Sequence, residues 1–309
     1  MRIITITLNP AFDVHCSAKE LTLYHENFVK TTAVDAGGKG INLSRALLAN
    51  GIQSQVVVVV GRENAAPYET ALREQGLQLV PIVTDGRIRE NITIHEADRP
   101  ETRVSFDGFS CSAGILREIT RRIGEVDENT VIAFTGSAPA GIDGEQILDF
   151  LDTFRRSGAK IVIDSRSIPF HKLIAFQPWL IKPNQDEAAI FSGRKVTGPE
   201  DAVAVAGEFH RAGIANVLLT LGGDGAVLAC DEGIFRAIVP AVEAKSTIGA
   251  GDSTIAGFIA GTMQGLQTEE RLKRAVAYGT AACMQAGTLP PHKADVERIE
   301  QRVVITLCQ

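Results

Sequence analysis

Short apolar runs and amphipathic segments alternate along most of this chain. Runs rich in Val and Ile, such as 56–60 and 131–135, are typical of buried strands, and segments with apolar positions at helical spacing follow them. Successive βα units of this kind predict an α/β fold whose mainly parallel sheet is covered by helices on both faces. The pattern predicts strands at 3–8, 56–60, 77–83, 131–135, 160–164, 179–182 and 216–220. It predicts helices at 40–50, 67–75, 143–157, 185–192, 199–212, 252–263, 268–285 and 293–300, so the chain is expected to end in helices.

Two stretches depart from this alternation of strands and helices. Residues 27–34 and 89–106 alternate polar and apolar positions, and Asp98-Arg99-Pro100 predicts a hairpin turn. Such alternation suits a small sheet with one face in water. We therefore expect one domain, 1–309, with a discontinuous β-sheet lid at about 10–36 and 87–110. A lid would keep water from a reacting group, and the alternative is a pair of surface hairpins without a gating role.

Composition narrows the class of partner. The 309 residues carry a net charge of −6 with no basic block, which argues against nucleic acid or an anionic membrane as a partner. The five cysteines are scattered without metal-ligand spacing, so neither a disulfide framework nor a zinc site is expected. No segment resembles a signal peptide or a membrane span. We expect a cytoplasmic location.

The run Gly249-Ala250-Gly251-Asp252 carries the strongest chemical signal. It precedes the apolar segment 255–263, as a glycine-rich turn does when it opens a helix. The first amides of a helix lack internal partners and favour anions, and the glycines allow close backbone approach. A carboxylate beside such a site repels phosphate but can take the proton of an attacking hydroxyl, which points to phosphoryl transfer with Asp252 as base. The alternative is an ordinary acidic residue that stabilises a helix start.

A second glycine-rich run, Gly37-Gly38-Lys39-Gly40-Ile41-Asn42, lies at a strand-to-helix junction. It is not a Walker A loop, because Gly40 and Ile41 follow the lysine where Ser or Thr is needed. The run at 249–251 does not give a dinucleotide fingerprint either, since Thr254 stands where glycine or alanine is required. Lysine charge, an amide and open backbone suit sugar hydroxyls, although a helix start with a solvated lysine fits the same pattern.

The two runs together carry a resemblance to a known family. The first, with Gly51 and Gly61, resembles the N-terminal signature of the ribokinase/PfkB sugar kinases, and the second, with Ala256-Gly257, resembles their C-terminal signature. The likeness runs over essentially the whole chain. It implies a ribokinase-like three-layer α/β/α sandwich with a small β-sheet lid, and ATP- and Mg²⁺-dependent phosphorylation of a sugar. It also implies that Asp252 is the general base and that amides of Gly249, Ala250 and Gly251 help form the anion hole.

Four further segments resemble the branch of this family that phosphorylates ketohexose phosphates. The branch comprises 1-phosphofructokinase, tagatose-6-phosphate kinase and the minor 6-phosphofructokinase. The resemblance favours fructose 1-phosphate as substrate, with tagatose 6-phosphate, fructose 6-phosphate or an unphosphorylated sugar as alternatives. A non-catalytic sugar-phosphate sensor on the same fold is the competing class. The segments are Thr7–Asp13, Gly136–Gly141, Asp164-Ser165 and Lys182–Glu187.

The resemblance implies roles for individual residues. The sugar hydroxyls would contact Asp13, Gly38, Lys39 and Asn42. The phosphate of the substrate would contact Arg89 and Ser137, with Arg103 as a further candidate, although either arginine could simply face solvent. The nucleotide would contact Lys182, Asn184 and the loop Thr220-Leu221-Gly222-Gly223-Asp224-Gly225, in particular Thr220, Gly222, Gly223 and Gly225.

Asn184 and Glu187 resemble the NxxE motif that helps to hold Mg²⁺ in this family. A capping box at a helix start explains the same two residues equally well. The segment Gln285-Ala286-Gly287-Thr288 stands where relatives often have an asparagine near the adenine, which leaves the adenine contacts open. Exposed edges of a lid sheet also favour a homodimer that pairs through the lid.

Overall fold

A large sheet forms the centre of the computed structural model, which describes residues 1–96, 99 and 101–308. The strand order is β14-β13-β12-β11-β10-β9-β8-β1-β4-β5. The seven strands from β11 to β5 run parallel, and β12, β13 and β14 add antiparallel pairs at one edge. Their bounds are β1 Arg2–Thr7, β4 Gln55–Gly61, β5 Gln78–Thr84, β8 Thr130–Thr135, β9 Lys160–Asp164, β10 Leu180–Ile181, β11 Asn216–Thr220, β12 Ala226–Cys230, β13 Gly233–Ile238 and β14 Val304–Cys308.

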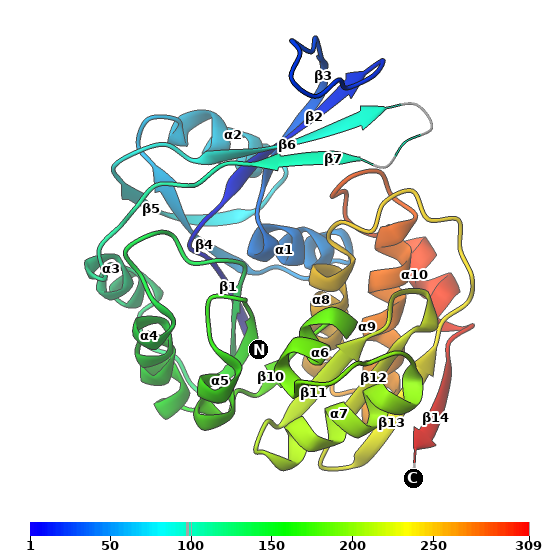
Figure 1. Ribbon diagram of the computed structural model, residues 1–309. Coiled ribbons are helices and arrows are strands. Elements are labelled where there is room, and N and C mark those ends of the chain that lie inside the picture. Colours follow the sequence, from blue (N-terminus) through cyan, green and yellow to red (C-terminus); the bar gives the residue numbers. More distant parts are fainter. Residues whose placement is uncertain (97–98, 100, 309) are drawn as a thin grey trace.

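Helices cover both faces of this sheet (Figure 1). One face packs against α1 (Lys39–Ala49), α8 (Ala250–Met263), α9 (Thr268–Cys283) and α10 (Lys293–Glu300). The other face packs against α3 (Gly114–Ile123), α4 (Gly144–Arg156), α5 (Phe170–Phe176), α6 (Gln185–Ser192) and α7 (Pro199–Arg211), and α2 (Ala65–Glu74) contacts β5. Alternate residues of β8 and β9 belong to different cores, one on each face of the sheet, which is why these strands consist largely of apolar residues. The predicted three-layer α/β architecture is confirmed.

The second sheet has four strands in the order β3-β2-β6-β7 and stands above α1 (Figure 1). It consists of β2 (Ala11–Ala18), β3 (Lys30–Gly37), β6 (Arg89–Glu96) and β7 (Thr102–Ser105), and so draws on two separate parts of the chain. The strand predicted at 27–34 lies three positions too early at both ends, because pairing with β2 runs from Lys30 to Gly37. Asp98 and Pro100 of the predicted hairpin turn lie outside the described residues.

The prediction that the chain ends in helices is wrong, because β14 follows α10. Strands β2, β12 and β13 and helices α3 and α5 were also not predicted. Several of these elements are short or half exposed, as is β14, so the apolar periodicity is too brief to mark them. In the described part of the chain, no helix is long and apolar enough to cross a membrane.

Candidate active site

Two adjoining cavities open at the carboxyl edge of the large sheet, where parallel strands present their loops and helix starts. One, here called the small-sheet cavity, has a volume of about 440 Å³ and extends from α8 to β2, β6 and β7. The other, the α9 cavity, has a volume of about 670 Å³ and lies between α8, α9 and the loop after β11. Lys182, Asn184 and Gly251 line both, so the two spaces meet at these residues.

The start of α8 forms the junction between the cavities. Gly249 precedes the helix with φ of 78°, a left-handed conformation that glycine adopts at little cost. The helix begins at Ala250, two residues before the predicted start, so Asp252 lies within its first turn. A Cβ on Gly251 would come within 3.0 Å of the Lys182 ammonium nitrogen. The sequence therefore brings helix amides, an ammonium group and a carboxylate to one point.

Asp252 is buried and has a polar partner from α1. Its Oδ2 accepts a hydrogen bond of 3.0 Å from Asn42 Nδ2. Burial and the nearby Asp164 carboxylate raise the pKa of Asp252 to about 7, and Lys39, Asn42 and Lys182 oppose that shift. A carboxylate with this pKa is suited to accepting a proton near neutral pH. The carboxylate is buried in the first turn of α8 and lines the small-sheet cavity.

Asp164 at the end of β9 is the residue that links the cationic groups. Its Oδ2 accepts a hydrogen bond of 2.9 Å from Lys39 Nζ, and its Oδ1 lies 3.7 Å from Lys182 Nζ. Burial alone would raise the pKa of Asp164, but Lys182 and Lys39 outweigh it and hold the pKa below its usual value. Burial likewise lowers the pKa of Lys39, yet Asp164 and Asp252 produce a net upward shift. These residues form an ionised network beside Asp252.

Sequence reasoning assigned no role to Asp164. The available signal was its place directly after a buried strand, where a polar side chain reaches the carboxyl edge of a parallel sheet.

The small sheet contributes a second polar cluster to the cavity. Asp13 on β2 accepts a hydrogen bond of 3.0 Å from Asn91 Nδ2 on β6, and Arg103 Nη2 on β7 lies 3.6 Å from the same Oδ1. Asn91 pairs directly with Asp13 across the parallel β2–β6 ladder, which fixes the contact. Asn91 was not predicted as a site residue. Arg103, the further candidate for contact with the phosphate of the substrate, lines the cavity.

Arg89 lies where the small sheet meets the loops after β1 and β8. Its Nε is buried and has no hydrogen-bond partner within the described structure, and burial lowers the pKa of its guanidinium although Asp13 opposes the shift. Asn9 donates to Ser137 Oγ at 3.3 Å, while its own Oδ1 also lacks a partner there. A cation with a free donor, next to a hydroxyl, can receive an anion.

The start of α6 has the geometry of a capping box. Asn184 Oδ1 accepts a hydrogen bond of 2.8 Å from the Glu187 amide, and Glu187 Oε2 accepts one of 3.1 Å from the Asn184 amide. The capping interpretation of these residues is thus confirmed. Glu187 Oε1 faces the cavity and accepts a hydrogen bond from Arg166.

The α9 cavity contains the residues predicted for the nucleotide. Thr220, Gly222, Gly223 and Gly225 line it, with Gly222–Asp224 forming a short 3₁₀ turn. Its far end is apolar and includes Val239, Val242 and Val276. Gln285 does not line this cavity, and its Nε2 lies 3.5 Å from Asp295 Oδ2 instead. A planar base would meet aliphatic side chains there.

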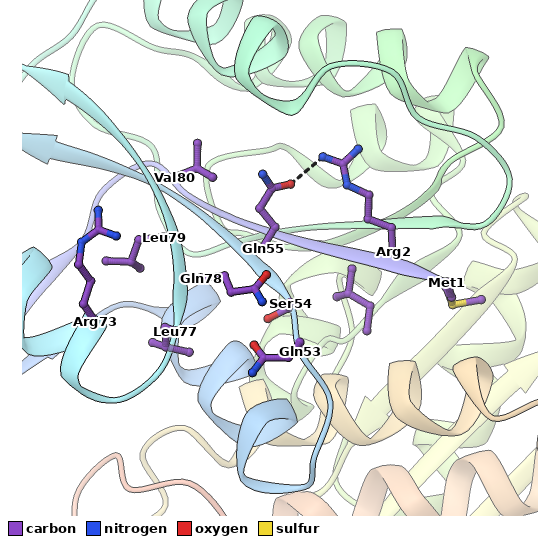
Figure 2. Close-up of a pocket in the computed structure, with 11 residues that line it drawn as sticks. Met1, Arg2, Gln53, Ser54, Gln55, Arg73, Leu77, Gln78, Leu79 and Val80 are labelled. Carbon is purple, nitrogen blue, oxygen red and sulfur yellow. Dashed lines mark hydrogen bonds between the residues drawn. The ribbon is translucent and has the colours of Figure 1, made fainter.

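A further cavity lies at the opposite edge of the large sheet, near the amino ends of β1, β4 and β5 (Figure 2). It has a volume of about 450 Å³, and one of its lining residues, Arg2, donates to Gln55 Oε1 at 2.7 Å. None of the predicted site residues lines it.

Every site residue predicted from the sequence lines the small-sheet cavity or the α9 cavity. The first contains Asp13, Gly38, Lys39, Asn42, Arg89, Arg103, Ser137, Lys182, Asn184, Glu187, Gly249, Gly251 and Asp252. The second contains Lys182, Asn184, Thr220, Gly222, Gly223, Gly225, Ala250 and Gly251. Residues that sequence reasoning assigned no role but that share the first cavity are Asn9, Asn91, Asp164 and Arg166.

Comparison with known proteins shows the family and the fold of the chain. The model of the pfkB family carbohydrate kinases matches residues 14–294. A 1-phosphofructokinase of Escherichia coli K12 is 33% identical over 286 residues, 92% of each chain, and one of Haemophilus influenzae is 30% identical over 309 residues, 99% of each chain. Phosphofructokinase-2 from Escherichia coli, in complex with substrates and products, has the same fold, with a TM-score of 0.90 at 24% identity over 98% of this chain and 99% of that one. The chain belongs to the pfkB family of carbohydrate kinases and is therefore a phosphotransferase.

Proposed function

We propose that this kinase phosphorylates fructose 1-phosphate at its 6-hydroxyl with ATP. The observation that carries this assignment is one cavity with two chemically different ends: buried Asp252 at the start of α8, and Arg89 with Arg103 at the small sheet. The first end suits an attacking hydroxyl and the second suits a phosphate already on the substrate. The relatives named 1-phosphofructokinase support the same choice.

In the proposed reaction the 6-hydroxyl oxygen attacks the γ-phosphorus of ATP. The bond from that phosphorus to the bridging oxygen breaks, ADP leaves, and Asp252 takes the hydroxyl proton. Free amides at the start of α8 and the ammonium of Lys182 stabilise negative charge on the group in transfer. The Asn42 amide holds the Asp252 carboxylate in place.

The sugar would lie between these ends. Asp13 can accept hydrogen bonds from two hydroxyls, and Lys39, Asn42 and the Gly38 backbone border the same space. Arg89 and Ser137, with Arg103, would then hold the phosphate at the other end of the sugar. This arrangement distinguishes a phosphorylated from an unphosphorylated hexose by charge.

The residues present are suited to Mg²⁺. The metal usually keeps several waters and is held through one or two carboxylates and substrate phosphates. Asn184 supplies a hard oxygen atom at the junction of the cavities, and Asp164 and Glu187 supply others in the small-sheet cavity. When bound, the ion would neutralise charge on the nucleotide phosphates. Asn184 and Glu187 stay oriented by the capping box, which leaves Asn184 Oδ1 a further lone pair.

A panel of acceptors tests this function. ADP release should be fastest with fructose 1-phosphate and slower with tagatose 6-phosphate and fructose 6-phosphate, and free fructose should react much more slowly. A preference for free sugars would contradict the phosphate site. Stabilisation by sugar phosphate without ATP turnover would instead support the sensor function.

The pKa of Asp252 predicts an acid limb in the pH profile, a fall of kcat/KM at low pH. The base must be ionised, and its pKa is raised to about 7 in the free enzyme. We expect kcat/KM to fall about tenfold for each pH unit below that value and to level off above it. Initial rates across about pH 5.5–8.5 measure this. A profile without an acid limb would show that Asp252 is not the base, and the residual activity of Asp252→Asn should lack the limb.

We further propose that the small sheet acts as a lid and pairs two copies of the chain. Large apolar side chains on it and its 19–29 loop remain exposed, and the interior of an interface is the usual place for such groups. Phe28→Asp should weaken dimerisation by about 30-fold or more, as at an interface hot spot, whereas exposed Ile190→Asp on α6 should leave it unchanged. Analytical ultracentrifugation measures this, and a wild-type monomer at all concentrations would contradict it. The exposed residues are Leu23, Tyr24, Phe28, Val34, Val104 and Phe106.

A cytoplasmic location accords with this function. All five cysteines are free thiols, three of them buried, which suits a reducing compartment. Assay of ADP-forming activity in fractionated cells tests the location.

A further inference from the structure

Arg166 lies at the mouth of the small-sheet cavity, in the loop that follows β9. Its Nε donates a hydrogen bond of 2.9 Å to Glu187 Oε1. The Arg166 side chain is 77% exposed, whereas that of Glu187 is only 10% exposed. A guanidinium has five donors, and within the described residues this one makes a single hydrogen bond. Arg166 is therefore held weakly and at one point.

The partner of Arg166 is the carboxylate that Mg²⁺ would approach. Glu187 Oε2 already accepts a hydrogen bond from the Asn184 amide, so Arg166 engages the oxygen that remains. In the nucleotide-free protein, Arg166 thus supplies the positive charge that balances Glu187. A divalent cation arriving at Glu187 would repel the guanidinium and take over that charge balance.

The space in front of Arg166 is where the transferred phosphoryl group would lie. Arg166 lines the same cavity as Asp252, Lys39 and Lys182, and Lys182 also reaches the α9 cavity. A nucleotide bound across the junction of the two cavities brings negative charge to this point. The planar guanidinium of arginine can form two parallel hydrogen bonds to phosphate oxygens. This interaction is stronger than the single exposed hydrogen bond to Glu187.

We propose that Arg166 moves from Glu187 to the γ-phosphate when the metal–nucleotide complex binds, and that it positions the phosphoryl group for transfer. This inference rests on the proposed function for the identity of the nucleotide. Arg166 should therefore contribute to the binding of a nucleoside triphosphate but not of a diphosphate, because only the triphosphate carries the γ-phosphate that Arg166 contacts.

Binding without any sugar tests the proposal. Isothermal titration calorimetry would compare MgADP with the Mg²⁺ complex of an ATP analogue that has an imido β–γ bridge. Arg166→Gln should weaken binding of the triphosphate about tenfold or more and change ADP binding less than about twofold, because hydrogen bonds to charged groups are the strong ones. Arg166→Lys keeps the charge without the fork and should fall between the wild type and Arg166→Gln.

A matched control is Lys172→Gln on α5, the helix that follows the same loop. It removes the ion pair of Lys172 with the exposed Glu145 on α4. It should leave both affinities unchanged. Mg²⁺ alone should stabilise Arg166→Gln more than the wild type in thermal unfolding, since the competing cation is gone.

Equal weakening of both nucleotides by Arg166→Gln would overturn the proposal and show that Arg166 only orients Glu187. Unchanged affinity for the triphosphate would overturn it as well. Because no sugar is present, these outcomes do not depend on which acceptor the enzyme uses. The acceptor panel can fail while this experiment succeeds, and the reverse also holds.

Discussion

Asp252→Asn is expected to lower kcat by about 10²–10⁴-fold while KM for the sugar phosphate changes little. Asparagine has nearly the same shape and can keep an oxygen toward Asn42, but it cannot accept the hydroxyl proton. Loss of an interaction made only as the proton moves lowers kcat rather than substrate binding. Initial-rate kinetics with fructose 1-phosphate measures the effect.

The same substitution should not destabilise the protein. The folded-state pKa of Asp252 is raised from the ordinary value of 3.8 to about 7, so folding favours the protonated form. As pH rises from about 4 to 7, the ionised carboxylate increasingly destabilises the native state, and the cost is complete above the folded pKa. Asp252→Asn removes this cost, so its melting temperature at pH 8 should equal or exceed that of the wild type, and the difference should shrink near pH 4.

The exposed carboxylate of Asp231 gives a control. Asp231→Asn lies in the turn after β12, outside both cavities, and should leave kcat unchanged. Near wild-type turnover of Asp252→Asn would exclude Asp252 as base. A large drop in melting temperature at pH 8 would instead indicate that its ionised form is structurally required.

The sequence predicts the centre of this fold better than its margins, for a physical reason. The parallel strands are buried on both faces, so β4 and β8 contain continuous apolar runs that mark them clearly as strands. Edge strands lack that signal: β14 is largely exposed and pairs with β13, whose partner residues lie 66–74 positions earlier in the chain. Long-range pairing of this sort leaves little local trace.

The site residues differ in the same way: a local motif marks some of them, and long-range contacts alone place the others. Glycine-rich runs mark Gly249 and Asp252 because backbone geometry and chemistry coincide there. Asn91 and Arg166 belong to no such motif. Each is placed in the site by a hydrogen bond to a residue distant in sequence: Asn91 to Asp13, and Arg166 to Glu187. Strand register and loop placement, rather than motif, bring these pairs together.

Arg89→Gln is expected to lower kcat/KM for fructose 1-phosphate by about 10–100-fold, mainly by raising KM. The Arg89 guanidinium is partly buried with an unpaired Nε, and burial lowers its pKa, so a bound phosphate would relieve an unfavourable environment. Glutamine retains a donor but removes the charge and the fork. With free fructose, which has no phosphate to contact, kcat/KM should change less than about threefold.

Arg87 offers a neighbouring comparison that isolates the role of the cavity. It lies two residues earlier, is exposed, and pairs with Glu90 at 3.0 Å. Arg87→Gln removes the same charge from the same segment, so its kinetics with both acceptors should match the wild type if only Arg89 contacts phosphate. Equal losses with fructose and fructose 1-phosphate in Arg89→Gln would show instead that Arg89 supports the shape of the sugar site. Selective loss with the phosphorylated acceptor alone would identify the small sheet as the element that selects a sugar phosphate over a sugar.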